Sequence, residues 1–150
     1  MDHTRHTANK EILTEINSRL EDGGKTPEKV IDISVVIKQI NRAIFEVSKE
    51  LGGGFRETVY QNALMLELKK EKLDARSNVP IKVRYKGVPV GEYLAHIVVE
   101  EQIILDVTMV DELEKVHETQ LINCLKATGY KVGLLINFAN EKAEVRRFSL

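Results

Sequence analysis

The chain has 150 residues, of which 43% are hydrophobic and 30% charged, a composition typical of one globular domain with its own core. The formal net charge of −1 excludes a uniformly basic protein that coats nucleic acid. A basic patch on one face of the domain is still compatible with this net charge. No stretch approaches the roughly 20 apolar residues that cross a membrane, and the polar beginning lacks the apolar core of a secretory signal, so we expect a cytoplasmic protein without a membrane partner.

The first 27 residues are predicted to form an extension of the domain. Apolar residues recur at helical spacing between about residues 8 and 20, which predicts a short amphipathic helix: Ile12, Leu13, Ile16 and Leu20. Two glycines and Pro27 then favour a turn or linker. We therefore expect an N-terminal helical extension at residues 1–27 and a folded domain at residues 28–150. Three alternatives remain open for this extension: it packs on the domain, it pairs with a second copy of the chain, or it makes no stable contact.

Two helices are predicted next. An apolar stripe with steps of four and three indicates one long helix: Ile33, Ile37, Ile40, Ile44, Val47 and Leu51. Three glycines, residues 52–54, end it because they supply backbone freedom and no helix propensity. A second helix is expected from near Arg56 to about Lys72, with its inward face formed by Val59, Tyr60, Ala63, Leu64 and Leu68.

Strands are predicted from Val79 onward. Alternating apolar and basic residues at 81–85 indicate a half-buried strand, and Lys86-Gly87 reads as a tight turn into residues 88–90. Two further apolar runs, 94–99 and 103–109, flank a short polar connection and predict a hairpin.

The remaining pattern predicts a helix and two strands. The acidic residues 111–114 are expected to open a helix whose apolar positions are Val116, Leu121, Ile122 and Leu125, with Gly129 as its cap. Residues 132–136 are almost wholly apolar, as in a strand covered on both faces, and residues 143–148 form the last strand. The expected fold class is α/β (α+β), a mixed sheet flanked by helices.

One motif stands between the two predicted helices. Residues 54–60, Gly-Phe-Arg-Glu-Thr-Val-Tyr, spell G-x-x-E-x-x-Y. This segment, together with residues 116–129 and 133–138, closely resembles the GxxExxY protein family, a branch of the PD-(D/E)XK nuclease superfamily. The resemblance covers roughly residues 33–148, with several separated motifs in the same order. It implies a restriction-endonuclease-like fold.

The resemblance also implies a nuclease site. In that superfamily an Asp on one hairpin strand and a Glu-x-Lys on the next hold a divalent ion such as Mg²⁺ or Mn²⁺ and activate water. Here the Asp position falls on His96, and Glu-x-Lys falls on Asp106-Val107-Thr108. The implied site residues are therefore Glu57, His96, Asp106, Thr108 and Gln120, a degenerate set without the lysine.

The metal-ligand set would be Glu57, His96 and Asp106, and each residue has a second interpretation. His96 is either a nitrogen ligand that suits a transition metal or a structural histidine hydrogen-bonded inside the sheet, and we favour the latter. Asp106 lies in an apolar run, where its charge needs a metal or a partner such as His96 across the hairpin. Glu57 either joins the site or braces the first turn of its own helix.

Two functions from different classes remain open at this point. The first is a non-catalytic domain that keeps the nuclease scaffold and binds another protein, DNA or a second copy of itself. The second is a diverged Mg²⁺- or Mn²⁺-dependent DNA nuclease, to which a lysine from elsewhere, such as Lys82 or Lys131, would have to contribute. A homodimer fits both.

Overall fold

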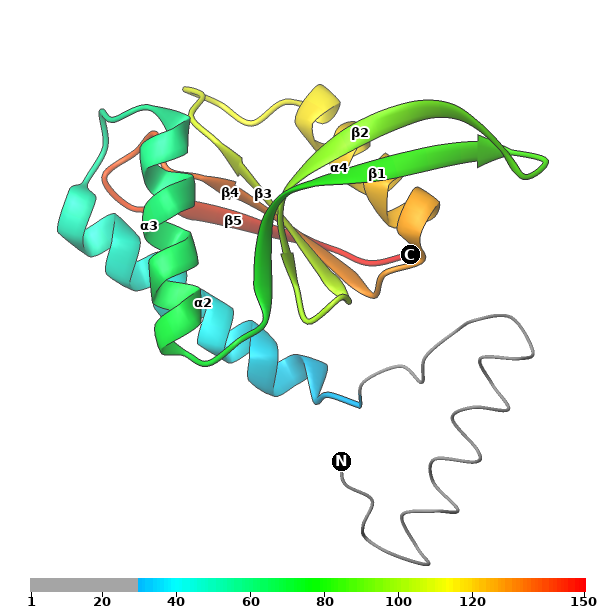
Figure 1. Cartoon of the computed structure of the whole chain (residues 1–150). Helices are drawn as coiled ribbons and strands as arrows, with labels where there is room; N and C mark the ends of the chain where they lie inside the picture. The colour runs from blue at the N-terminus through cyan, green and yellow to red at the C-terminus, as the bar shows by residue number, and fades with distance from the viewer. Residues whose placement is uncertain (1–29) are drawn as a thin grey trace, which may run out of the picture. The chain divides into compact units, whose positions relative to one another are not determined.

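The computed structural model describes residues 30–150, so the predicted N-terminal helix and linker lie outside the described residues. The elements follow one another along the chain as α2 (Ile33–Leu51), α3 (Glu57–Lys70), β1 (Ala75–Tyr85), β2 (Val88–Val99), β3 (Ile103–Thr108), α4 (Lys115–Thr128), β4 (Val132–Asn137) and β5 (Glu144–Phe148) (Figure 1). The predicted order of helices and strands is confirmed.

The first two helices begin and end near the predicted residues. The Asp32 carboxylate accepts hydrogen bonds from the backbone N–H and the hydroxyl of Ser34, which caps the start of α2. Gly52 follows the last turn with a φ of 61°, a conformation that favours glycine. One predicted inward position is wrong: Val59 is 36% exposed, because α3 turns Tyr60 and Leu64 toward the core.

The five strands form one mixed sheet in the order β1-β2-β3-β4-β5. The β1–β2, β2–β3 and β4–β5 pairs are antiparallel, and β3–β4 is parallel, with α4 as the crossover between those two strands. Lys86 and Gly87 both have positive φ, as a tight hairpin turn requires. Residues 88–99, which the sequence divides into two apolar runs, form the single strand β2.

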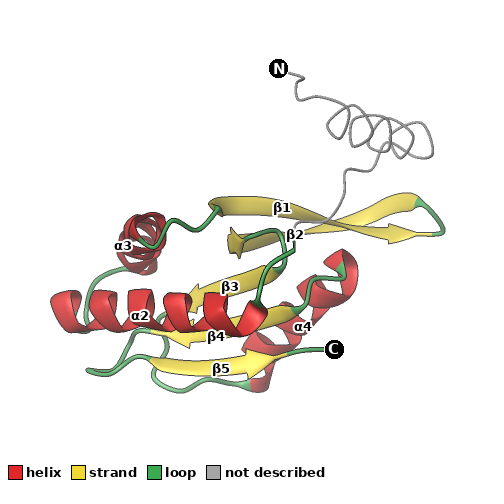
Figure 2. Cartoon of the chain, turned by 90° about the horizontal axis from the view of Figure 1, so that it is seen from below, coloured by secondary structure: helices red, strands yellow, loops and turns green. Residues whose placement is uncertain are grey.

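The core lies on both faces of the sheet. Every residue of β4 is buried, which confirms the prediction of a doubly covered strand. Figure 2 shows α2 and α4 on opposite faces of the sheet. The face under α4 is packed with residues from four strands, the helix and the loop before it: Ile81, Ala95, Val98, Ile104, Leu113, Leu121, Cys124, Leu125 and Leu135. Among residues 30–150, no helix is long and apolar enough to cross a membrane.

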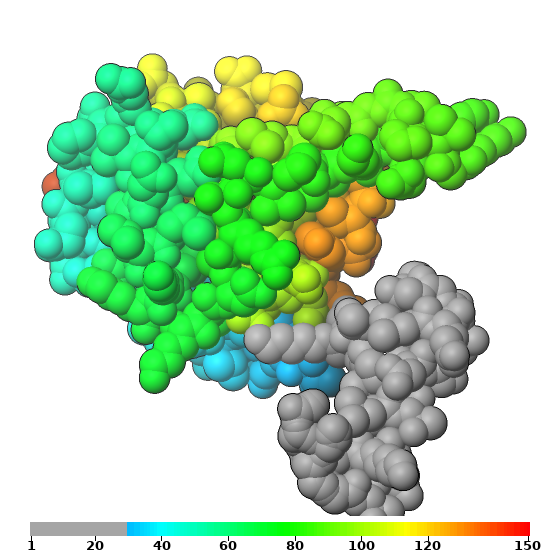
Figure 3. All heavy atoms as spheres, in the orientation of Figure 1, coloured from blue at the N-terminus to red at the C-terminus, as the bar shows by residue number. Residues whose placement is uncertain are grey.

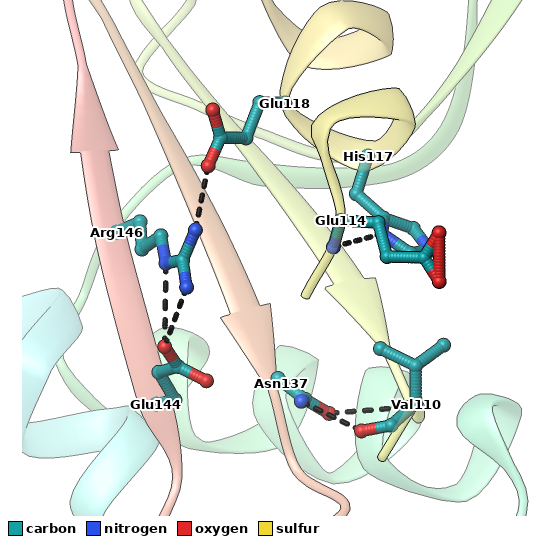
Figure 4. A network of polar contacts seen from close by, with 7 residues as sticks. All are labelled: Val110, Glu114, His117, Glu118, Asn137, Glu144 and Arg146. Carbon is teal, nitrogen blue, oxygen red and sulfur yellow. Dashed lines mark hydrogen bonds and ion pairs between the residues drawn. The ribbon is translucent and has the colours of Figure 1, made fainter. Parts of the chain in front are cut away.

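Helix α4 begins later than the acidic run predicts. Glu114 is the N-cap residue, and its backbone N–H donates to His117 Nδ1 at 3.0 Å (Figure 4). The Glu114 side chain in turn accepts from the His117 N–H, which completes a capping box. His117 therefore has a structural role rather than being an ordinary solvated position. Val116, predicted to face inward, is 56% exposed because the helix starts one turn after the expected residue. Gly129 ends the helix with a φ of 74°, as predicted.

Candidate functional site

A cleft opens where β2 and β3 diverge. Their ladder ends at the pair Ile97 and Leu105, so the next residues toward the cleft, His96 and Asp106, stand at the mouth of the gap. The cleft has a volume of about 390 Å³ and extends from the start of α3 to α4. All five residues implied by the sequence line it: Glu57, His96, Asp106, Thr108 and Gln120.

Glu57 reaches the cleft from the first turn of α3. The preceding loop is held by Tyr60, whose hydroxyl donates to the Gly52 carbonyl at 2.5 Å and accepts from the Phe55 N–H at 3.3 Å. The Tyr60 ring is fully buried and stacks on Phe138 with centroids 4.8 Å apart. The last residue of the G-x-x-E-x-x-Y motif thus fixes the loop that presents its glutamate.

His96 lies between two carboxylates. Its Nδ1 is 2.9 Å from Asp106 Oδ1, and its Nε2 is 3.7 Å from Glu57 Oε1. The side chains of His96 and Asp106 are only 24% and 22% exposed, whereas Glu57 is 44% exposed. The contact between His96 and Asp106 across the hairpin, one of the two alternatives left open for Asp106, is present.

The Val107 N–H also lies 2.9 Å from His96 Nδ1, and one nitrogen cannot both accept from this amide and donate to Asp106. The neutral ring accepts from Val107, and the doubly protonated ring donates to Asp106. The hydrogen bond to Asp106 raises the pKa of His96 above its ordinary value despite the opposing effect of burial, and the charge of Glu57 adds to the increase. The charged form, bonded to Asp106, is therefore favoured over a wider pH range than for a free histidine.

The lysine of the superfamily pattern has no replacement in the cleft. Thr108 lies two residues after Asp106 on β3, so both side chains share one face of the strand, and Thr108 is 91% buried. Among residues 30–150, no lysine or arginine lines this cleft, and Lys82 borders a different groove. Neither lysine suggested by the sequence, Lys82 or Lys131, supplies a charge here.

The donor set does not fit a bound Mg²⁺ or Mn²⁺ in this arrangement. Each carboxylate approaches a different nitrogen of the same ring, so one ion cannot contact all three groups unless His96 moves. A protonated His96 adds a positive charge at the same place. Within the part of the chain that the structure describes, no three His, Cys, Asp or Glu side chains are grouped so that they could hold a metal ion.

Helix α4 closes the cleft. Gln120 is exposed on it, whereas Cys124 is buried, and burial together with the charge of Asp106 raises the pKa of its thiol, so the sulfur stays protonated. The sequence analysis missed Glu92 and Tyr93, which also line the cleft. Their position depends on the bend of β2 over α4, which no local pattern encodes.

The fold and the cleft together define a restriction-endonuclease-like domain, with a three-stranded antiparallel meander, a helical crossover and the candidate residues at the point where β2 and β3 diverge. The chain belongs to the PD-(D/E)XK nuclease superfamily, whose family model matches residues 34–148. A solved structure described as "Crystal structure of SSO0001" is similar to the chain with 12% identity and a TM-score of 0.49, over 97% of this chain and 79% of that one. No curated protein matches the sequence.

The charge state of His96 leads to a prediction about pH. Asp106→Asn is expected to lower the free energy of unfolding by about 1.5–3 kcal/mol, the contribution of a hydrogen bond to a charged group. Because the folded pKa of His96 is raised, this difference from the wild type is fully present below the unfolded pKa of about 6.5, provided that Asp106 is ionised. It is lost as the pH rises through the folded pKa.

Urea unfolding of both proteins at a series of pH values measures the difference, and an NMR titration of the His96 ring protons follows the pKa itself. The exposed Asp111→Asn is the matched control and should show no such dependence. A difference that grows with rising pH would mean that the folded ring is held neutral by the Val107 N–H.

Proposed function

We propose that this chain is a binding member of the PD-(D/E)XK superfamily that does not hydrolyse phosphodiester bonds. The observation that carries the proposal is the placement of His96 between Glu57 and Asp106, at distances of 3.7 and 2.9 Å. In a hydrolytic site these carboxylates would be free to hold a divalent ion. Here His96 contacts both carboxylates, and its protonated ring offsets one of their two negative charges. It also stands at the position that the resemblance assigns to the superfamily's first aspartate.

The absence of a cation at Thr108 supports the same proposal. Stabilising the charge that develops on a phosphate in the transition state requires a preorganised positive group close to the reacting oxygens. The described residues that line the cleft include no lysine or arginine, and its acidic side chains, Glu57, Glu92 and Asp106, would repel a phosphate. The cleft is then a polar recess of a binding protein, whose partner is a protein, DNA or a second copy.

Calorimetric titration of Mn²⁺ and Mg²⁺ into the full chain tests the proposal, beside Asp106→Ala. We expect no saturable binding that depends on Asp106 at up to millimolar metal, and no cleavage of single- or double-stranded DNA. The decisive partner variant is His96→Asp, which removes the histidine and restores the acidic position; it is expected to gain Mn²⁺ binding that disappears in the His96→Asp, Asp106→Ala double variant.

The second candidate function is a metal-dependent DNA nuclease with a rearranged site, and it is favoured by the convergence of Glu57, Asp106 and Gln120 on one cleft. Wild-type Mn²⁺ binding that vanishes in Asp106→Ala, followed by DNA cleavage with the same dependence, would establish it. That result would overturn the non-catalytic proposal, because it would show that the His96 side chain moves away and a metal ion binds between the two carboxylates.

A further inference from the structure

A second groove lies between the β1–β2 hairpin and α4, beside the candidate site. It has a volume of about 520 Å³. The hairpin projects from the body of the domain, and α4 runs next to it (Figures 1 and 3). Tyr93 lines both hollows and forms the wall between them.

Three basic residues from two elements line this groove. Lys82 and Arg84 lie two residues apart on β1, and Lys126 comes from the last turns of α4. Within residues 30–150 none of the three makes an ion pair, and no carboxylate lines the groove. Glu92 is the cross-strand partner of Lys82 on the same face of the sheet, and it lines the candidate site without making an ion pair with that lysine.

The groove also has an ordered polar wall. Asn123 lies one helical turn before Lys126, so both side chains share a face of α4. The amide of Asn123 donates a hydrogen bond to the Tyr93 hydroxyl at 3.3 Å, which ties the helix to β2. This contact sets the separation between the cation of α4 and the two cations of β1.

Protection of an open sheet edge explains only part of this arrangement. Lysine, arginine and proline on an edge strand prevent another chain from pairing with it, and Lys82, Arg84 and Pro80 serve that role on β1. Lys126 stands on a helix, where no edge needs protection. Lys82 has Glu92 as its cross-strand neighbour, whereas no carboxylate that lines the groove stands beside Arg84 or Lys126. The positive charges repel one another, so an anion that enters the groove relieves the repulsion.

We propose that this groove binds a ligand that carries two or more linked phosphate groups. Three cations match the charge of a diphosphate or triphosphate better than that of a single carboxylate, and the planar guanidinium of Arg84 can bind two phosphate oxygens at once. The ring of Tyr93 offers a flat surface for the organic part of such a ligand. The proposal concerns a different hollow from the candidate site and stands whether or not that site hydrolyses anything.

Titration of the full chain with pyrophosphate and with ATP, in the presence of EDTA, tests the proposal by calorimetry and by NMR shifts of the residues around the groove. We expect saturable binding that weakens at least about tenfold in the Arg84→Gln, Lys126→Gln double variant. Lys69→Gln, an exposed lysine on α3, is the matched control and should bind like the wild type. Asp106→Ala should also bind normally, which separates this result from the metal test above.

A competition experiment identifies the source of the phosphates. Displacement of ATP by a short single-stranded oligonucleotide, with the same dependence on Arg84 and Lys126, would assign the groove to a nucleic-acid backbone, whereas binding of the free compounds without such displacement would assign it to a small phosphorylated molecule. Failure of pyrophosphate, ATP and the oligonucleotide to bind would overturn the proposal. Equal competition by poly-glutamate would also overturn it, because the groove would then accept acidic peptides without selecting phosphate.

Discussion

Asn137→Ala is expected to lower the free energy of unfolding by about 3 kcal/mol, since three partly buried backbone groups lose their partner at once. Asn137 is fully buried at the end of β4. Its side-chain oxygen accepts from the Val110 N–H at 3.2 Å, and its amide nitrogen donates to the Val110 carbonyl at 2.8 Å (Figure 4). The same oxygen also accepts from the Ala139 N–H at 3.1 Å. Alanine satisfies none of these groups.

Urea unfolding at neutral pH measures this loss, with Asn140→Ala as the matched control because Asn140 is exposed in the loop that follows. The control should change the free energy of unfolding by less than about 0.5 kcal/mol. Asn137 is also the register partner of Thr108, so the same side chain fixes the chain where it leaves the candidate site. A loss below about 1 kcal/mol in Asn137→Ala would mean that water enters and replaces the amide.

Gly133→Val is expected to destabilise the domain by about 2–3 kcal/mol, because the new side chain has no room under α4. A Cβ atom at Gly133 would lie 2.8 Å from Leu121 Cδ1 and 2.9 Å from Leu121 Cγ. Leu121 is 1% exposed, so it cannot turn away into solvent. Gly91→Val on β2 is the matched control, since nothing lies within 4 Å of a Cβ there.

A double variant shows whether Leu121 causes the loss. Leu121→Ala alone should cost about 2–5 kcal/mol through the cavity that it leaves. Combined with Gly133→Val, it should cost less than the two single changes added together, by more than about 1 kcal/mol, because the valine fills part of that cavity. Simple additivity in urea unfolding would contradict a direct clash between the two residues.

The fold could be predicted largely because the spacing of apolar residues differs between its helices and strands. The stripe of α2 has helical spacing, β1 alternates, and β4 is apolar up to its last residue, Asn137, so each pattern matches the burial of its element. The errors in predicted burial occur at helix beginnings. Val59 and Val116 are apolar yet exposed in the first turn of α3 and α4, where tertiary packing rather than the sequence pattern decides the orientation.

The sequence predicted which residues line the candidate site better than it predicted how they are arranged. The resemblance to the GxxExxY family brought together five residues that do line one cleft, and the contact between His96 and Asp106 follows from the hairpin register. Sequence spacing cannot show that His96 separates Asp106 from Glu57, because that order depends on where α3 begins relative to the sheet. The roles of these residues and the assignment to the GxxExxY branch stay predictions.

The order of the strands has a consequence for how the chain folds. Each strand pairs with the next strand along the chain, so the sheet can grow by one strand at a time. Loop closure costs little entropy when the joined segments are near in sequence, and rates of folding rise as that separation falls. The crossover through α4 is the one wide closure in residues 30–150 that the sheet requires, and the docking of α4 against β3 and β4 is therefore expected to limit the rate at which the described domain forms.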